Sequence, residues 1–472
     1  MKRNIFYAIA AVLLMTTACS EDFIEKTPEL QLNEQLIFQS SARLGAAVEG
    51  VYARAKSEYF LGGYVVDAGD NRSDDIVNYG NNGYTMRDTY FHNVNASAIE
   101  NDNMFYYAYL GINYANILIK GIEETYADAL PVDAATAKKY VQECKFIRAI
   151  SFYYLSQLFG QPYTFSPDAK NIPMRITPVV GPGESICPPS TIKEVLTQIL
   201  ADTEDVSALP AGFGAAGFDA TKASQAAAHA LRMRVYMCME DWDKAIEEGK
   251  KITGFELIPS IATMFDLPYA CTAENIFSSP MTTSDRAGTQ SHPVGFFFHS
   301  AGQISCVNNI NGIYTEYGVA GDARTDFILT DAKGYSYCEK YNEYSTRLEW
   351  IPLFRYAEIL LNLSECYYNK GNETEALAAL KQVRTRSIPA ASDPIVTYTE
   401  KGTALWTAID NERRWEFLTE GIRGYDISRR SEDYRHPLTD GAWEVVATPG
   451  DRTTYCWAFP LYETTVNTAL SN

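Results

Sequence analysis

The sequence predicts a mainly helical fold in which pairs of helices form a scaffold and long loops lie between them. Apolar residues recur at helical spacing in several segments, and each segment ends at a residue that can stop or cap a helix. Between these segments, residues 62–95, 161–190 and 266–349 are rich in Gly, Asn, Pro and Tyr and show no sustained period. We expect short strands or helices at most in these loops. Loops of this length in a helical protein are usually functional.

The first residues predict export rather than folded structure. Lys2 and Arg3 precede an apolar run that is too short to span a bilayer, as in a secretory signal peptide over residues 1–18. The small residues before Cys19 resemble a bacterial lipobox, so we expect Cys19 to be acylated. Thr16 departs from that motif, and an ordinary signal peptide cut nearby is the alternative.

The segment after the cysteine is expected to be a lipidated tether. Residues 19–35 are polar and contain Pro28, as in flexible coil. The acidic Ser20-Glu21-Asp22 resembles the export signal of bacterial surface lipoproteins. This resemblance implies a protein that is held at the outer membrane by lipid and faces the cell exterior.

Three helices are predicted in the N-terminal half of the remaining chain. Residues 104–123 carry a Tyr-rich apolar face, residues 139–159 carry a second stripe, and residues 191–209 carry a third that ends at Pro210. A further helix is predicted at residues 405–421.

Two segments predict a helix, a tight turn and a second helix. In residues 223–252, Asp241 can cap the second helix. In residues 353–386, Gly371 can end the first helix and Asn372 can cap the second. Both pairs resemble tetratricopeptide helix pairs, although the full consensus is absent. The predicted domain covers residues 36–472.

Composition excludes some functions and leaves the redox state open. The formal net charge of −19, without a run of Lys or Arg, argues against nucleic acid as a partner. Eight cysteines remain after Cys19, with no C-x-x-C, and several fall on apolar helix faces. We expect mostly free, buried thiols, with one disulfide left open.

No cofactor is expected. Residues 212–217 fit G-x-G-x-x-G, but they follow the end of a helix and not a strand, so they form an inter-helix loop. Four carboxylates lie close together in one predicted loop, and their oxygens could bind Ca²⁺; they are Asp67, Asp70, Asp74 and Asp75. They lack the spacing of an EF-hand loop, so a solvated turn is the favoured interpretation.

Residues 412–429 closely resemble the signature helix of the SusD/RagB family. The matching positions are Glu412, Arg413, Glu416, Glu420, Gly421, Arg423, Asp426 and Arg429. Residues 146–162, 226–252, 321–324, 355–386 and 459–472 also resemble family segments. The resemblance implies a SusD-like fold from about residue 36 to the end. It further implies a surface lipoprotein that binds a nutrient and delivers it to a SusC-like TonB-dependent transporter.

The signature carboxylates allow two interpretations. Glu412, Glu416 and Glu420 recur every four residues on one predicted helix face, and paired carboxylates can hydrolyse glycosides. Alternatively, Arg413, Arg414, Arg423 and Arg429 can neutralise them in an ion network together with Asp426. Carboxylates beside arginines tend towards low pKa values, whereas a general acid needs a raised one. We favour the network and expect no enzyme activity.

Aromatic loops are the predicted ligand site. The candidate contacts in the first loop are Arg72, Tyr79, Asn81, Asn82, Tyr84, Arg87 and Tyr90, and those in the second are Phe296, Phe298, Tyr314 and Tyr317. Flat rings with amides and guanidinium groups at their edge complement a sugar, so we expect an oligosaccharide ligand. These aromatics could instead cover the scaffold or face the transporter. The alternative functions are a family member that binds peptides or another nutrient, and a glycan-degrading lipoprotein enzyme.

Overall fold

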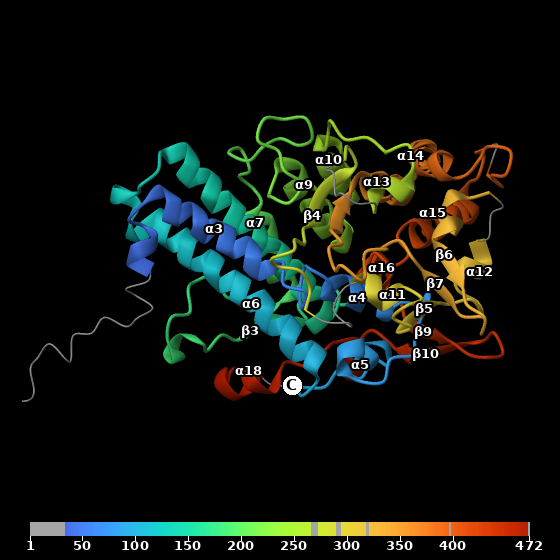
Figure 1. The fold of residues 1–472 in the computed structure, drawn as a ribbon, viewed down its shortest axis with the longest axis horizontal. Coiled ribbons are helices and arrows are strands. Elements are labelled where there is room, and N and C mark those ends of the chain that lie inside the picture. The colour runs from blue at the N-terminus through green and yellow to red at the C-terminus, as the bar shows by residue number, and fades with distance from the viewer. Residues whose placement is uncertain (1–33, 266–271, 289–293, 318–320, 396–397, 471–472) are drawn as a thin grey trace, which may run out of the picture.

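The computed structural model describes residues 34–265, 272–288, 294–317, 321–395 and 398–470. The predicted mainly helical fold is confirmed: helices alone form one end of the molecule, and helices together with short strands form the other (Figure 1). The signal peptide, Cys19 and most of the tether lie outside the described residues. Within the described ranges, no helix is both long and apolar enough to cross a bilayer.

Three long helices pack side by side at one end. They are α3 (Ser41–Ala55), α6 (Ile99–Lys120) and α7 (Ala134–Phe159), and the last two confirm the predictions at 104–123 and 139–159 (Figure 1). The Asp133 carboxylate begins α7 by accepting a hydrogen bond from the Thr136 backbone N–H at 2.7 Å. At its C-terminal end, α6 runs into the π-helical turn η3 (Gly121–Thr125).

Two helix pairs stack against each other, as predicted. The pair α9 (Gln225–Cys238) and α10 (Trp242–Lys251) is joined by a tight turn in which Asp241 caps α10. The pair α13 (Tyr356–Asn369) and α14 (Glu373–Ser387) is joined through Gly371, at φ 74°, and Asn372, which caps α14. Helix α10 packs against α13, so the two pairs form one continuous scaffold.

The predicted helix at 191–209 is too long. Helix α8 (Ile192–Asp202) begins with a capping box between Thr191 and Glu194, as the sequence pattern suggests. It ends at Asp202, because the following residues form a turn in which the Asp205 carboxylate accepts a hydrogen bond from the Ser207 backbone N–H at 3.2 Å.

The predicted helix at 405–421 is two helices. Helix α15 (Gly402–Glu416) and helix α16 (Ile422–Arg429) are separated by a turn. Thr419 and Gly421 in this turn have φ values of 64° and 77°, which a continuous right-handed helix cannot accommodate. The carboxylate of Asp70 accepts a hydrogen bond from the Gly421 backbone N–H at 2.7 Å, so tertiary contacts fix the break.

Short antiparallel strands support the loop-rich end. A four-stranded sheet has the order β1 (Ile76–Asn78), β5 (Ser305–Val307), β7 (Ser336–Cys338) and β6 (Ile328–Thr330). Three two-stranded sheets pair β9 (Tyr434–Pro437) with β10 (Trp443–Ala447), β4 (Asn275–Ser279) with β8 (Ile351–Arg355), and β2 (Lys170–Pro173) with β3 (Pro189–Thr191).

Short helices complete the described chain. They are α4 (Tyr64–Asn71), α5 (Arg87–Tyr90), α11 (Val294–Phe298), α12 (Ile313–Tyr317), α17 (Arg452–Tyr455), α18 (Leu461–Val466), η2 (Gly83–Thr85), η4 (Ala127–Ala129), η5 (Pro182–Glu184), η6 (Ile261–Met264) and η7 (Ala323–Phe327). Helix α4 is a short helix, as expected in loop 62–95, but it is buried along its whole length, so this part of the loop belongs to the core.

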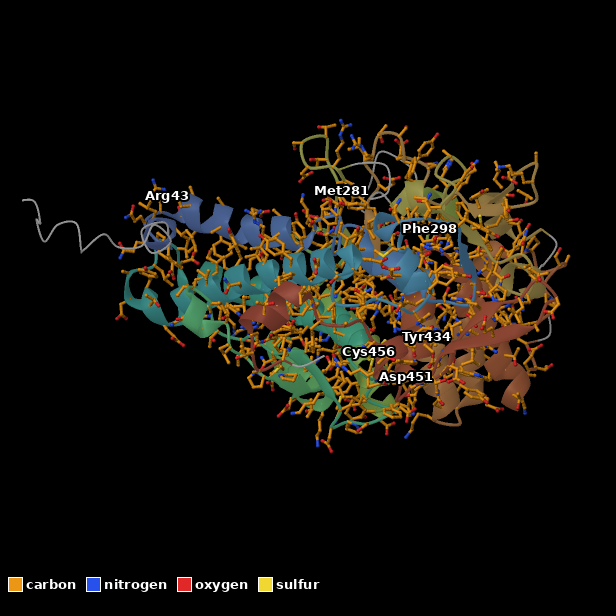
Figure 2. The ribbon with its side chains drawn as sticks, turned by 90° about the horizontal axis from the view of Figure 1, so that it is seen from below. Arg43, Met281, Phe298, Tyr434, Asp451 and Cys456 are labelled. Carbon is orange, nitrogen blue, oxygen red and sulfur yellow. The ribbon has the colours of Figure 1, made fainter. Side chains whose placement is uncertain are left out.

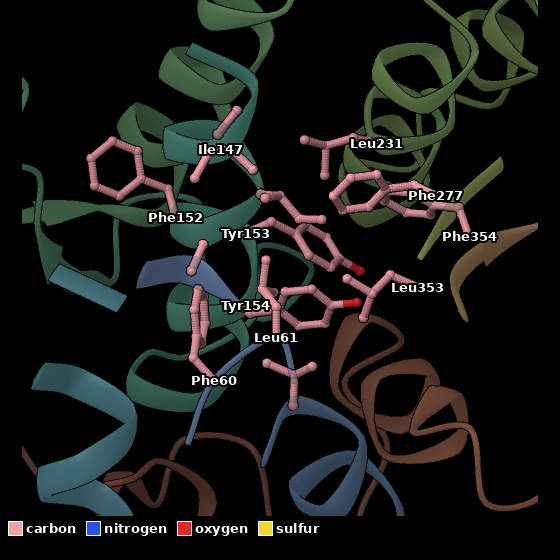
Figure 3. Close-up of a cluster of buried hydrophobic side chains, with 14 of the residues drawn as sticks. Phe60, Leu61, Ile147, Phe152, Tyr153, Tyr154, Leu231, Phe277, Leu353 and Phe354 are labelled. Atoms are coloured by element: carbon pink, nitrogen blue, oxygen red, sulfur yellow. The ribbon is translucent and has the colours of Figure 1, made fainter. Parts of the chain in front are cut away.

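The core lies where α7, α9 and the β4–β8 pair meet. Figure 3 shows Ile147 and Tyr154 of α7 facing Leu231 of α9 and the rings of Phe277 and Phe354. Seven of the eight cysteines after Cys19 are among the described residues; each is a free thiol, and only Cys187 is not fully buried. The expectation of mostly free, buried thiols therefore holds for these seven, of which six are buried, and Cys271 lies outside the described residues.

Candidate functional site

The three signature carboxylates are buried and unavailable to a ligand. Glu412 and Glu416 lie on α15, whereas Glu420 lies in the turn after it. The prediction that all three share one helix face is therefore wrong for Glu420. Burial alone would raise the pKa of Glu416, but Arg386, Arg355 and Arg324 hold that pKa well below its usual range. A carboxyl with a lowered pKa cannot serve as the general acid of glycoside hydrolysis.

The predicted ion network is present, but its partners differ from those predicted. The cations come from other segments. Arg324 and Arg384 contact Glu412 at 2.6 and 2.8 Å, and Arg386 contacts Glu416. Arg355 contacts both Glu416 and Glu420 at 2.6 Å, and Lys340 contacts Glu420 at 2.8 Å. The network therefore joins α15 to η7, β8 and α14. Its role is to hold these elements together.

The signature arginines pair with other carboxylates. Arg413 and Arg429 each donate to Asp426, at 2.9 and 2.8 Å. Arg423 donates to Asp74 at 2.8 Å, and Arg414 pairs with Asp75 at 2.7 Å. These pairs tie the C-terminal helices to the residues that follow α4.

The acidic loop is neither a solvated turn nor a Ca²⁺ site. Asp67, Asp70, Asp74 and Asp75 are all buried. Asp74 and Asp75 are neutralised by Arg423 and Arg414, and the Asp70 carboxylate accepts from the Gly421 N–H. Within the described ranges, no group of acidic, His or Cys residues is arranged to hold a metal ion.

Helix α4 contacts the α15–α16 turn backbone to backbone. A Cβ atom added to Gly69 would lie 2.1 Å from the Gly421 carbonyl oxygen, and one added to Gly424 would lie 2.1 Å from the Gly69 carbonyl oxygen. Any side chain at either position would force the two segments apart. The glycines therefore permit the close approach in which Asp70 reaches the Gly421 N–H.

Two predicted ligand contacts in the first loop are structural residues. Arg72 is 1% exposed, and its guanidinium donates to the carbonyl oxygens of Gln157 at 3.1 Å and Tyr455 at 2.6 Å. It also lies over the Tyr434 ring. Tyr434 and Cys456, which are labelled in Figure 2, belong to one small hydrophobic cluster. Tyr90 is buried and stacks on His436 with ring centroids 4.0 Å apart. The prediction that Arg72 and Tyr90 contact a ligand is therefore corrected.

Two exposed rings, Tyr79 and Tyr335, lie in contact beside the four-stranded sheet, and a third, Phe91, packs on the buried Tyr90; we group the three as an aromatic platform. Tyr79 is 51% exposed. The rings of Tyr79 and Tyr335 are 4.9 Å apart, and Phe91 meets the buried Tyr90 edge to face at 5.1 Å. Burial lowers the pKa of His436 to about 4, so the ring that supports Tyr90 is uncharged near neutral pH.

Polar groups line the edge of the platform. The Arg87 guanidinium lies over the Phe91 ring at 4.7 Å and donates to the Gly80 carbonyl oxygen at 2.8 Å. Asn81 and Asn82 are exposed, and the Asn82 side chain caps η2 while it donates to Asn81 at 2.9 Å. Exposed rings with amides and a guanidinium group beside them can bind a ligand that has both apolar and hydroxylated faces.

A buried carboxyl, Glu100 of α6, holds the platform loop in place. It accepts hydrogen bonds from the backbone N–H groups of Asp88 and Thr89, each at 3.1 Å, and contacts the Thr89 hydroxyl. Burial raises the pKa of Glu100 to about 8. The carboxyl is therefore neutral at neutral pH in the folded protein, while its unfolded pKa lies near 4.5.

We expect the free energy of unfolding of Glu100→Gln to depend less on pH than that of the wild type. Because the folded pKa lies above the unfolded pKa, the contribution of Glu100 is fully present below about pH 4.5 and is lost as pH rises towards 8. The loss amounts to a few kcal/mol at most, since one pKa unit corresponds to about 1.4 kcal/mol. Urea unfolding of both proteins between pH 5 and about pH 9 measures the difference. The exposed Glu124→Gln is the control, and equal pH slopes for wild type and Glu100→Gln would contradict the assignment.

The second predicted aromatic cluster does not form a platform. Phe298 of α11 is buried in the core, which corrects its prediction as a ligand contact, and Phe296 is half-buried against it. Tyr314 of α12 is half-buried and stacks on Trp415, with ring centroids 6.0 Å apart. Tyr317 ends α12, and its side chain lies outside the described residues. Helices α11 and α12 are separate elements (Figure 1).

The predicted ligand contacts omit three residues of the site, which are Phe91, Tyr335 and Glu100. Tyr335 joins Tyr79 only because the β6–β7 hairpin pairs into the sheet that contains β1, a contact between distant parts of the chain. Glu100 belongs to no recognisable sequence motif. It lies just before the predicted Tyr-rich helix at 104–123, and the structure places it in the first turn of α6. Tyr84 is exposed and lies near Tyr59 of the α3–α4 turn, while its backbone N–H donates to the Asn82 side chain at 3.0 Å.

The fold and the site define a class: a tetratricopeptide-like helical scaffold that carries a loop-built aromatic surface. One family model, described as the SusD family, matches residues 307–463, and another, described as starch-binding and associating with the outer membrane, matches residues 22–237. A SusD superfamily structure from Bacteroides fragilis is 38% identical, with a TM-score of 0.84 over 92% of this chain and 100% of its own. This chain belongs to the SusD/RagB family.

Other relatives are more distant. The SusD-like protein P2 of Formosa agariphila is 26% identical over 90% of both chains. A structure from Bacteroides vulgatus, described as a putative sugar binding protein, is 19% identical with a TM-score of 0.74, over 92% of this chain and 98% of its own. At this identity, the second likeness shows the fold alone.

Proposed function

We propose that this chain binds an oligosaccharide on the aromatic platform and does not change it chemically. The observation that carries the proposal is the pair of exposed rings, Tyr79 and Tyr335, 4.9 Å apart with Asn81, Asn82 and Arg87 nearby. Sugars offer apolar C–H faces and a rim of hydroxyls, which rings, amides and guanidinium groups complement. The starch-binding description of one matching family model supports a carbohydrate ligand.

We further propose that the protein is anchored at the outer membrane through Cys19, faces the cell exterior and delivers its ligand to a SusC-like TonB-dependent transporter. The outer-membrane description of the matching family model supports the location. The lipobox-like segment supports the anchor. Membership of the SusD/RagB family supports the transporter as partner.

Two alternatives remain to be separated from this proposal. A peptide or another nutrient could be the ligand of the same scaffold, because the signature residues are buried and do not touch a ligand. A glycan-degrading enzyme is disfavoured, because the signature carboxylates are ion-paired. Incubation of the purified chain with a glycan library separates all three functions. Retention without product supports the proposal, whereas product release or exclusive peptide binding contradicts it.

Replacing Tyr79 and Tyr335 by Ala is expected to weaken glycan binding about 10- to 100-fold, because two stacking surfaces are lost. Both side chains are exposed, so the fold should survive. Tyr90 is left in place, because its removal would open a cavity beside His436. Calorimetry with the retained glycan measures the loss, with circular dichroism as the fold control. Phe213→Ala, an exposed aromatic residue between α8 and α9, is the matched control.

A further inference from the structure

Five tyrosines form a row that leads away from the platform loop. We define this tyrosine row as Tyr84, Tyr59, Tyr107, Tyr106 and Tyr462. Tyr84 lies within electrostatic range of Tyr59. Tyr59 stacks on Tyr107 with ring centroids 5.2 Å apart and an interplanar angle of 21°, and Tyr107 meets Tyr106 edge to face, also at 5.2 Å. Tyr84, Tyr106 and Tyr462 are exposed, and the two rings between them are half-buried.

The row ends in a pocket of about 250 Å³ between α6 and α18. Tyr106 and Tyr462 line this pocket together with Tyr109, Asn113 and other residues. We call it the α18 pocket. The Asn113 side chain is fixed by two hydrogen bonds with the Val179 backbone, at 3.0 and 2.7 Å. The pocket wall therefore combines aromatic rings with a positioned amide.

A charged pair lies at the inner end of the α18 pocket. Arg175 donates to Glu463 at 2.6 Å and to the Ser185 carbonyl oxygen at 2.8 Å. Its buried Nε has no hydrogen-bond partner among the described residues. A buried donor without a partner is costly, so the Arg175 side chain stays in this wall because of its other contacts, with Glu463 and Ser185.

Separate elements bring the row together along α6. Gly83 of η2 sits so close to Ile99 that an added Cβ would lie 2.9 Å from the Ile99 side chain. On the other side, the Leu461 backbone N–H of α18 donates to the Ala96 carbonyl oxygen at 2.8 Å. Helices α5 and α18 lie near the N-terminal end of α6 (Figure 1).

We propose that the tyrosine row is a binding surface for an extended glycan chain whose terminal unit enters the α18 pocket. This proposal rests on the proposed function, since it takes the ligand to be a carbohydrate. Tyr106 and Tyr462 offer exposed rings at the α18 pocket, and Asn113 and Arg175 add an amide and a guanidinium group, a combination that complements a sugar unit. The platform alone would hold a short sugar, whereas platform and row together select a chain of several units.

Chain-length dependence of binding tests the proposal. Soluble oligosaccharides of two, four and eight units, prepared from the polysaccharide that the wild type retains, are titrated by calorimetry. We expect wild-type affinity to rise with length. Tyr106→Ala combined with Tyr462→Ala should lower the affinity for the eight-unit chain roughly tenfold or more and leave the two-unit affinity unchanged. Both side chains are exposed, so the fold should persist, and each single variant provides a second measurement. Phe213→Ala is again the control.

The outcomes separate this proposal from the proposed function. If the wild type retains no glycan, both fail. If it retains a glycan but the double variant binds the eight-unit chain as tightly as the wild type, the tyrosine row is not a glycan surface. The α18 pocket and the exposed apolar residues near it, Ile176, Val180, Ile186, Leu461 and Val466, would then fit a protein partner.

Discussion

Glu416→Ala is expected to lower the free energy of unfolding by about 3–5 kcal/mol, because it removes one partner of a buried ion network. The carboxylate is fully buried and contacts Arg324, Arg355 and Arg386. Its removal would leave three buried guanidinium groups with less compensation. Because the folded pKa of Glu416 is lowered, this stabilisation is present above about pH 4.5 and is lost as pH falls below it. Urea unfolding at pH 7 measures the effect.

A surface ion pair provides the matched control for this variant. Glu123 is exposed and pairs with Lys145 at 2.8 Å, so Glu123→Ala should cost less than about 1 kcal/mol. The folded Glu416→Ala protein should bind its ligand with wild-type affinity, because Glu416 lies apart from the platform rings. If the variant is as stable as the wild type but has lost binding or an activity, Glu416 belongs to the functional site and not to the scaffold.

Cys19→Ala is expected to abolish membrane attachment. If Cys19 carries the lipid, its replacement removes the proposed anchor, and the described residues contain no helix that could span the bilayer instead. The protein should then leave the outer membrane fraction, or its precursor should remain in the inner membrane. Fractionation and metabolic labelling with palmitate measure the result.

Another cysteine controls for the chemistry of the substitution. Cys187 is a free, partly exposed thiol, so Cys187→Ala should leave both fractionation and the lipid label unchanged. Unchanged membrane attachment of Cys19→Ala together with no label on the wild type would overturn the anchor.

The helical scaffold was predictable because its signals are local. Apolar stripes, Asp241 and Gly371 mark helices and turns within a few residues, and the structure has the pairs α9–α10 and α13–α14 where the sequence predicts them. The signature acids and bases also predicted an ion network. Their actual partners, such as Arg355 and Arg386, could not be predicted, since helix periodicity says nothing about which strand or helix packs on a face.

The loop-rich end was predicted less well, since burial there depends on distant segments. Residues 62–75 carry polar side chains without a period, yet α4 and the residues after it are buried because C-terminal arginines neutralise Asp74 and Asp75. Tyr79 and Tyr90 look alike in sequence, but a hairpin stacks His436 on one of them and leaves the other exposed. The aromatic composition of residues 62–95 therefore pointed to the loop that carries Tyr79, but it did not identify Tyr335.

The glycine contact between α4 and the α15–α16 turn also constrains when the chain can fold. Its hydrogen bond joins Asp70 to Gly421 across 351 residues, and Asp74 reaches Arg423 across 349. Contacts of such high sequence separation form late and slowly, because a very long loop must close first. Helix α4 and the residues after it therefore cannot reach their native packing until the chain is present at least as far as Arg423. Until then, the buried carboxylates of Asp70 and Asp74 lack these C-terminal partners, and this part of the chain stays incompletely folded.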